Sequence, residues 1–236
     1  MAGGDVLETG EASNSGGFRI KSYVLRSGRT SKAQQRSLDR LSGAYCVPFT
    51  ESPIDFRAVF GNDNHVTVEI GFGMGSATAE IASENPQKNY IGIEVFRAGV
   101  GRLLWEIENR RLANVRIIEH DAIDVLEKMI PDGSLDAFHI FFPDPWLKKR
   151  HRKRRLVKRP FTDILASKLK NGGYICMVSD CADYCDSALA ELSAVKTLRN
   201  ACLKFAPRQR WRPITKFEEK SLSRGRAPTE LLFIKE

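Results

Sequence analysis

One carboxylate in this sequence stands in a setting that suggests chemistry. Asp144 lies between two prolines in the segment FFPDPW, residues 141–146. Proline fixes its own φ angle and restricts the residue before it, so Pro143 and Pro145 hold the carboxylate in a stiff turn. Trp146 adds a flat apolar ring on which a base can stack. Taken alone the segment could be a simple turn, but its position after an apolar strand and before a basic stretch predicts a catalytic corner.

The most positive stretch of the chain follows this corner at once. Residues 148–155, KKRHRKRR, hold seven Lys or Arg residues and one His, and we call them the basic run. The whole chain has a net charge of +8; residues 146–160 hold nine Lys or Arg and no acid, and the remaining 28 bases and 29 acids nearly cancel. A dense basic patch on a nearly neutral body is typical of proteins that bind a polyanion. The alternative is a solvated loop that only keeps the protein in solution.

A second group of candidate residues surrounds a glycine-rich turn. The segment EIGFGMG contains one acid and three glycines, Glu69, Gly71, Gly73 and Gly75. Glycines permit a tight turn and let the backbone approach a ligand closely. Glu94 ends the next expected strand, where a carboxylate can accept both hydroxyls of a ribose. Asp121 follows the third expected strand, near where an adenine edge would lie. The pattern predicts a ligand with an adenosyl group.

Two cofactors fit an adenosyl site. A dinucleotide prefers the spacing G-x-G-x-x-G, but here the third glycine comes one residue early and Ser76 takes the later place. Glu69 would repel a pyrophosphate, whereas it would attract the ammonium or sulfonium of S-adenosylmethionine. We therefore favour S-adenosylmethionine over NAD. A glycine-rich turn without any ligand is the remaining alternative.

The elements that must position these groups alternate along the chain. Hydrophobic periodicity predicts strands over 66–70, 90–94, 115–119, 135–142, 174–179 and 231–235, and helices over 76–85, 96–111, 122–129, 161–170 and 181–194. This alternation indicates an α/β fold, with a mostly parallel sheet covered by helices on both faces. The carboxyl ends of parallel strands meet at one edge, so the four candidate acids should converge there.

The chain before the first strand divides into two parts. Residues 1–17 contain Gly, Ser and acids but no Lys or Arg, which predicts a disordered tail. Residues 18–60 form a basic arm and extension, and 61–236 the main domain. The arm offers a possible second contact to a polyanion, although its charge could equally be a matter of chance.

Other classes of protein are disfavoured. No apolar run approaches the roughly 18 to 20 residues that span a bilayer, and the N-terminus lacks the basic start and apolar centre of a secretory signal. The five cysteines lack the paired C-x-x-C spacing of a zinc site. We expect reduced thiols in a cytoplasmic protein that binds neither membrane nor metal.

These motifs together resemble the bacterial tRNA (guanine-N7-)-methyltransferases. The resemblance rests on EIGFGMG at 69–75, GIE at 92–94, FFPDPW with the basic run, Ser179-Asp180, and TKFE at 215–218, and it covers roughly residues 20–236. It implies a class I, Rossmann-like methyltransferase fold with seven strands, the last of them antiparallel. It also implies transfer of a methyl group from S-adenosylmethionine to N7 of a guanine in the tRNA variable loop, by a monomer or homodimer.

The resemblance assigns roles to individual residues. Asp144 would be the catalytic residue and would line the cofactor pocket with Glu69, the three glycines, Glu94 and Asp121. Contacts to tRNA would come from the basic run, namely Lys148, Arg150, His151, Arg152, Lys153, Arg154 and Arg155. Further substrate contacts would come from Asp180, Thr215, Lys216, Phe217 and Glu218.

The sequence departs from the family pattern at three places. Leu147 stands where a His is expected, Lys220-Ser221 replaces an Arg-Gly pair, and Arg226 stands where a His is usual. Two other functions stay open: methylation of an exocyclic base amino group, whose enzymes carry a related Asp/Asn-Pro-Pro-aromatic motif, and RNA binding by a vestigial methyltransferase fold.

Overall fold

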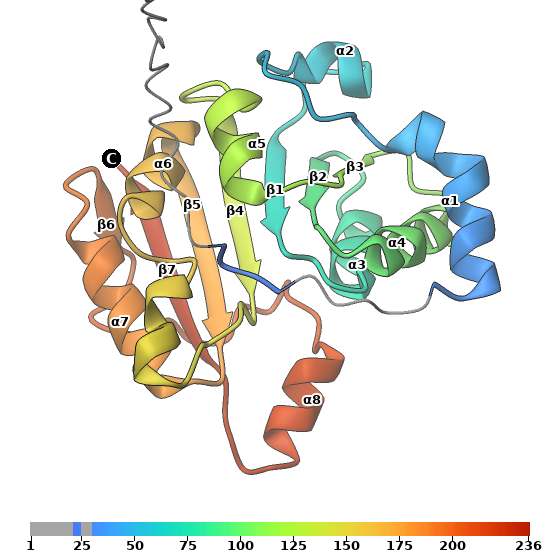
Figure 1. Cartoon of the computed structure of the whole chain (residues 1–236). Coiled ribbons are helices and arrows are strands. Elements are labelled where there is room, and N and C mark those ends of the chain that lie inside the picture. The colour runs from blue at the N-terminus through green and yellow to red at the C-terminus, as the bar shows by residue number, and fades with distance from the viewer. Residues whose placement is uncertain (1–20, 25–29) are drawn as a thin grey trace, which may run out of the picture.

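A seven-stranded sheet forms the centre of the molecule, in the order β3-β2-β1-β4-β5-β7-β6 (Figure 1). The structure is a computed structural model that describes residues 21–24 and 30–236. The strands are β1 Val66–Ile70, β2 Asn89–Ile93, β3 Val115–Ile118, β4 Leu135–Phe141, β5 Leu169–Ser179, β6 Leu198–Asn200 and β7 Thr229–Lys235.

The direction of the strands decides where the site lies. β1 pairs in parallel with β2 and β4, β2 with β3, and β4 with β5. Only β7 runs against its neighbours, β5 and β6. The predicted α/β fold, with its last strand antiparallel, is confirmed. The carboxyl ends of β1 to β5 therefore share one edge of the sheet, which is the lower edge in Figure 1.

Helices cover both faces of the sheet. The helices are α1 Lys32–Tyr45, α2 Phe56–Phe60, α3 Ser76–Glu84, α4 Arg97–Arg110, α5 Ala122–Lys128, α6 Phe161–Lys168, α7 Ala182–Ser193 and α8 Lys216–Leu222, with a 3-10 helix η1 at Lys149–Arg154. Apolar side chains of α5, α6 and α7 fill one core, and those of α1, α3 and α4 fill the other. Because both faces are buried, β1 and β2 consist of buried residues throughout.

The largest differences from the predicted boundaries lie around residue 169. The helix predicted over 161–170 ends at Lys168, and β5 begins at Leu169 instead of Tyr174. Leu169 pairs with Leu135, and the register then shifts before Tyr174 pairs with Ala137. The sequence Asn-Gly-Gly at 171–173 is typical of a turn, but here it forms an irregularity inside the strand, where Gly172 has a φ of 80°.

The segment before β1 packs onto the same body. Ser31 and Gln34 form a reciprocal capping box that starts α1. The Gln34 side chain donates to the Ala98 carbonyl at the start of α4, at 3.0 Å. A Cβ at Gly101 would lie 2.8 Å from the Gln34 carbonyl oxygen, so the two helices meet at nearly bare backbone. The tail predicted at 1–17, and parts of the arm predicted at 18–60, lie outside the described residues.

Residues 21–24 and 30–236 contain no helix that is both long and apolar enough to cross a membrane. All five cysteines fall within these described residues, and none forms a disulfide.

Candidate active site

The glycine loop, residues 71–75, leads from β1 into α3. Gly71, Gly73 and Gly75 have φ angles of 72°, 58° and 70°, a region that favours glycine. A Cβ added at Gly71 or Gly73 would meet nothing within 4 Å, so these two positions border open space. At Gly75 a Cβ would instead lie 2.7 Å from the Leu103 side chain. Two glycines therefore leave room for a ligand, and the third allows α3 to pack against α4.

Glu69 lies near the carboxyl end of β1 and is almost fully buried. The Thr78 hydroxyl donates to its carboxylate at 2.8 Å. Burial raises the pKa of Glu69 from 4.5 to about 7; the bond from Thr78 opposes this increase and the charge of Glu94 adds to it. Near neutral pH this carboxyl group is thus poised between its two protonation states.

Glu94 follows β2 and binds the glycine loop. Its Oε2 accepts the backbone N–H of Gly73 at 2.8 Å, and its Oε1 accepts those of Val95 and Phe96 at 2.7 and 3.0 Å. Burial raises the pKa of Glu94, the three backbone bonds oppose the increase, and the charge of Asp144 adds to it. Glu94 and Asp144 therefore interact electrostatically, although they belong to different strand ends.

Asp121 follows β3 and caps α5. Its side chain accepts the N–H of Ile123 at 2.9 Å, and the residue is almost fully buried. The cap fixes this carboxylate at the same edge of the sheet as Glu69 and Glu94.

The proline corner, residues 142–146, carries Asp144 past the end of β4. The Phe142 N–H still donates to the Val178 carbonyl of β5 at 2.8 Å. Phe142 and Trp146 have φ angles of 51° and 44°, which bulky residues rarely adopt. Two left-handed residues and two prolines thus fix the path of the chain on both sides of Asp144, which is exposed.

Trp146 is held from two directions. Its Nε1–H donates to the Ser22 carbonyl at 2.9 Å, and the Arg154 guanidinium lies 4.0 Å from its ring centroid. Arg154 also donates to the carbonyls of Lys21 and Tyr23, at 3.0 and 2.8 Å. The platform predicted on Trp146 for a base is therefore covered by Arg154 on one face of the indole.

The basic run is not uniform. Lys148, Arg150, Arg152 and Lys153 are exposed, and His151 is half-buried. Arg155 is only 4% exposed; it donates to the Pro145 carbonyl at 2.9 Å and forms an ion pair with Asp183. Burial argues against the predicted phosphate contact of Arg155. Its guanidinium instead holds the proline corner against α7.

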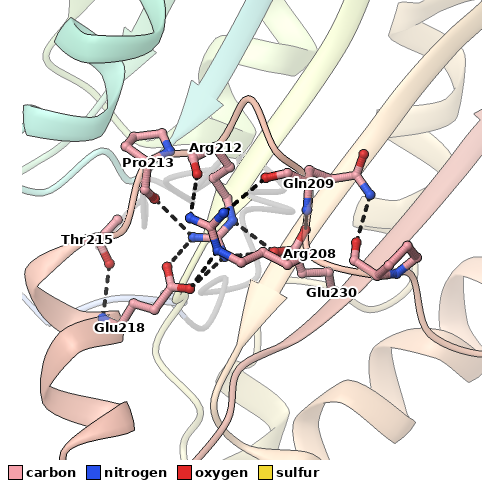
Figure 2. Close-up of polar contacts among 8 residues, drawn as sticks. Arg208, Gln209, Arg212, Pro213, Thr215, Glu218 and Glu230 are labelled. Atoms are coloured by element: carbon pink, nitrogen blue, oxygen red, sulfur yellow. Dashed lines mark hydrogen bonds and ion pairs between the residues drawn. The ribbon is translucent and has the colours of Figure 1, made fainter.

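The residues predicted on the C-terminal side surround α8. The Thr215 hydroxyl caps this helix by accepting the N–H of Glu218 at 3.1 Å, and Lys216 and Phe217 are exposed. The Glu218 carboxylate is buried and binds Arg212 and Arg208 (Figure 2). These ion pairs argue against the predicted substrate contact of Glu218, because the carboxylate is turned into the protein.

Asp180 follows β5 and contacts two of the departures from the family pattern. Its Oδ2 accepts the Ser221 hydroxyl at 2.7 Å and lies 3.9 Å from the Arg226 guanidinium. The third departure, Leu147, is 69% exposed beside the proline corner.

Sequence reasoning missed Gly99. This residue lies in α4, and a Cβ there would stand 2.0 Å from the Gly73 carbonyl oxygen. The pattern A-G-V-G at 98–101 was a usable signal, because glycine is costly inside a helix and needs a packing reason.

Comparison with known proteins agrees with this geometry. A family model described as a putative methyltransferase matches residues 63–231. The tRNA (guanine-N(7)-)-methyltransferase of Ralstonia pickettii (strain 12J) is 47% identical over 218 residues, which cover 92% of this chain and 85% of that protein. The enzyme of the same name from Francisella tularensis subsp. novicida (strain U112) is 45% identical, covering 92% and 95%. The chain belongs to the tRNA (guanine-N(7)-)-methyltransferase family.

More distant structures share the fold of this family. A 30S ribosomal A1408 methyltransferase from an uncultured bacterium has a TM-score of 0.54 at 19% identity, covering 78% of this chain and 96% of that one. The 16S rRNA methyltransferase KamB has a TM-score of 0.56 at 13% identity, covering 77% and 93%.

Proposed function

We propose that this protein transfers a methyl group from S-adenosylmethionine to N7 of a guanine in the variable loop of tRNA. The observation that carries the proposal is the position of Asp144. It follows β4, its charge acts on Glu94 beside the glycine loop, and it shortly precedes the five exposed Lys and Arg residues of the basic run. A carboxylate between an adenosyl site and a phosphate-binding surface suits a methyltransferase that acts on RNA. The names of the close relatives support the same activity.

The residues at the strand ends fit the cofactor. Open space at Gly71 and Gly73 leaves room for backbone to contact a ligand. Glu69 offers a carboxylate to a cationic group. The three backbone bonds of Glu94 leave about one of its four lone-pair sites, on Oε2, to accept a ribose hydroxyl. Asp121 would border the adenine. When bound, S-adenosylmethionine supplies an electrophilic methyl group.

Asp144 would act on the guanine. Guanine N7 has an in-plane lone pair and no proton, so the protein needs to supply alignment more than a strong base. The ring gains positive charge as N7 is methylated, and a nearby carboxylate stabilises that charge. Asp144 could equally accept hydrogen bonds from N1–H and the 2-amino group, which would select guanine.

The exposed cations would hold the phosphates of the tRNA. We assign this role to Lys148, Arg150, Arg152 and Lys153. The half-buried His151 would donate a ring N–H to a phosphate, and Arg154 would reach a phosphate beside residues 21–24. Asp180, Thr215, Lys216 and Phe217 would contact the nucleotide from the other side. Because the proposed substrate is tRNA, we place the protein in the cytoplasm. The proposed activity is compatible with a monomer or a homodimer.

The test is incubation of the protein with labelled S-adenosylmethionine and unmodified tRNA, followed by borohydride–aniline cleavage, which cuts RNA at 7-methylguanine. We expect incorporation of label and cleavage in the variable loop. Label without cleavage would indicate an exocyclic amino group as the target. Binding of tRNA without any label would indicate an RNA-binding protein that has lost catalysis.

A further inference from the structure

Arg212 lies at the centre of a charged cluster that also contains Arg208, Glu218 and Glu230 (Figure 2). Its side chain is fully buried and binds both carboxylates. To Glu230 it donates from Nε at 3.0 Å and from Nη2 at 2.7 Å. To Glu218 it donates from Nη2 at 3.0 Å and also from Nη1. One guanidinium therefore joins two carboxylates that belong to different elements.

The cluster is balanced in charge and densely bonded. Arg208 donates to Glu218 at 3.3 Å and to the Arg212 carbonyl at 2.6 Å, and Glu230 also accepts the Gln209 N–H at 3.0 Å. Burial acts to raise the pKa of Glu218, but the bonds and charges of Arg212 and Arg208 outweigh it, so the pKa falls. The Glu218 carboxylate thus stays ionised. The bidentate bond from Arg212 to its two oxygens fixes its orientation.

The cluster lies next to the strand that carries the proline corner. The Arg212 guanidinium is 5.8 Å from the ring centroid of Phe141, the last residue of β4. The neighbouring Trp211 stacks on His139 of the same strand, with ring centroids 4.6 Å apart. Asp144 follows Phe141 by only three residues, so the segment that anchors α8 also packs against the base of the proline corner.

α8 depends on such anchors because it has only seven residues. A helix of this length is not stable by itself in water. Glu218 fixes its first turn to Arg212, and Ser221 fixes its last turn to Asp180. Between these anchors Lys216 is exposed, and Phe217 is 67% exposed. One buried contact, to Arg212, and one partly buried contact, to Asp180, therefore set the position of the side chains that α8 presents to solvent.

We propose that Arg212 is a positioning residue for RNA. By holding Glu218 against Glu230 it sets α8 so that Thr215, Lys216 and Phe217 contact the tRNA beside Asp144. The inference rests on the proposed function and adds a residue to it that touches neither cofactor nor RNA. The glycine loop and its acids lie on other elements, so the affinity for cofactor should not depend on Arg212.

The decisive variant is Glu218→Gln, because Arg212 then keeps Glu230 as its partner and no buried carboxylate is left unpaired. We expect the KM for tRNA to rise about tenfold or more, which corresponds to the loss of roughly 1.4 kcal/mol of binding. The Kd for S-adenosylhomocysteine should change less than about twofold, and hydrogen exchange should speed up in α8 but not in β7. Arg212→Lys should show the same pattern, since an ammonium cannot bind both carboxylates in this way.

The matched control is Arg199→Met, which removes an exposed ion pair with Glu236 at the opposite edge of the sheet. It should leave the KM, the Kd and the exchange of α8 unchanged. Parental KM and parental exchange in Glu218→Gln would overturn the proposal. An equal loss of cofactor affinity would also overturn it, since the cluster would then support the fold in general. If the parent protein does not methylate tRNA, the proposed function fails, and tRNA affinity with α8 exchange still decides the role of Arg212.

Discussion

The Asp144 carboxylate is exposed, and the backbone on both sides of it is rigid. The two prolines and the left-handed φ angles of Phe142 and Trp146 fix the turn whether or not the side chain is charged. Asn has nearly the same shape as Asp and can occupy the same turn. The chemistry of this residue is therefore separable from its effect on folding.

We predict that Asp144→Asn folds normally and still binds tRNA, while its turnover falls about 10²-fold, the scale for loss of one well-placed electrostatic partner. Single-turnover methylation at saturating cofactor and tRNA measures the effect. A rate close to the parental one would mean that Asp144 only shapes the corner.

Glu69 predicts a pH dependence. Its pKa is about 7 in the folded protein and 4.5 ordinarily, so between these values the folded state binds more protons than the unfolded state. The free energy of unfolding should therefore fall as the pH rises through this window. Glu69→Gln should remove this part of the pH dependence, which thermal unfolding from about pH 4.5 to 7 would reveal.

The same residue should couple pH to cofactor binding. The ionised carboxylate attracts the positive charge of S-adenosylmethionine, so the affinity of the parent should increase as the pH rises through about 7. In Glu69→Gln this increase should be absent. If the affinity of both proteins for S-adenosylmethionine changed with pH in the same way, Glu69 would not contact the cofactor.

At the scale of elements, α4 packs closely against the glycine loop and limits where the loop can lie. A Cβ at Gly99 would meet the Gly73 carbonyl at 2.0 Å, and Gly73 also donates to Glu94. We predict that Gly99→Ala displaces the loop and weakens S-adenosylhomocysteine binding about tenfold to a hundredfold, from a steric cost of roughly 1–3 kcal/mol. Calorimetry measures the Kd. Gly43→Ala is the control, because a Cβ at Gly43 in α1 meets nothing within 4 Å.

The elements that sequence reasoning found are those with their own periodic signal. β1 to β5 and α3 to α7 alternate in the regular way of a parallel sheet, and glycines and acids mark their ends; the apolar run of β7 was also predicted. β6 has only three residues, and α8 is held by ion pairs that form only after folding. Neither feature leaves a local pattern that could be read from the chain.

Among the site residues the same limit applies to buried charges. The basic run looks uniformly suited to phosphate, yet Arg155 is buried against Asp183, far along the chain. Glu218 lies in a motif expected to face substrate, but its partners Arg212 and Arg208 turn it inward. The sequence predicts where charged side chains cluster, but tertiary contacts decide which of these side chains are exposed to solvent.

At the scale of the whole molecule, the basic run predicts that the affinity for tRNA depends on salt concentration. Affinity for tRNA should fall steeply with ionic strength, and Arg150→Ala or Lys153→Ala should each flatten the slope by about 0.7–0.9, because each removes one phosphate contact. Filter binding over a range of salt concentrations measures the slope. Arg199→Ala should leave the slope unchanged. Arg155→Met should lower the melting temperature, because the Pro145 carbonyl loses its donor, whereas Asp183 keeps its ion pair with Arg152.

The place of β7 has a consequence for synthesis on the ribosome. β7 comes after β6 in the chain but lies between β5 and β6 in the sheet. Until β7 has emerged, the nascent protein exposes the long edge of β5, and β6 has no partner, a state that invites aggregation or capture by chaperones. β7 also supplies Glu230, the carboxylate that fixes Arg212. The proposed contact of α8 with tRNA would therefore form only after β7 has been made, so a product that ends before β7 should not make this contact.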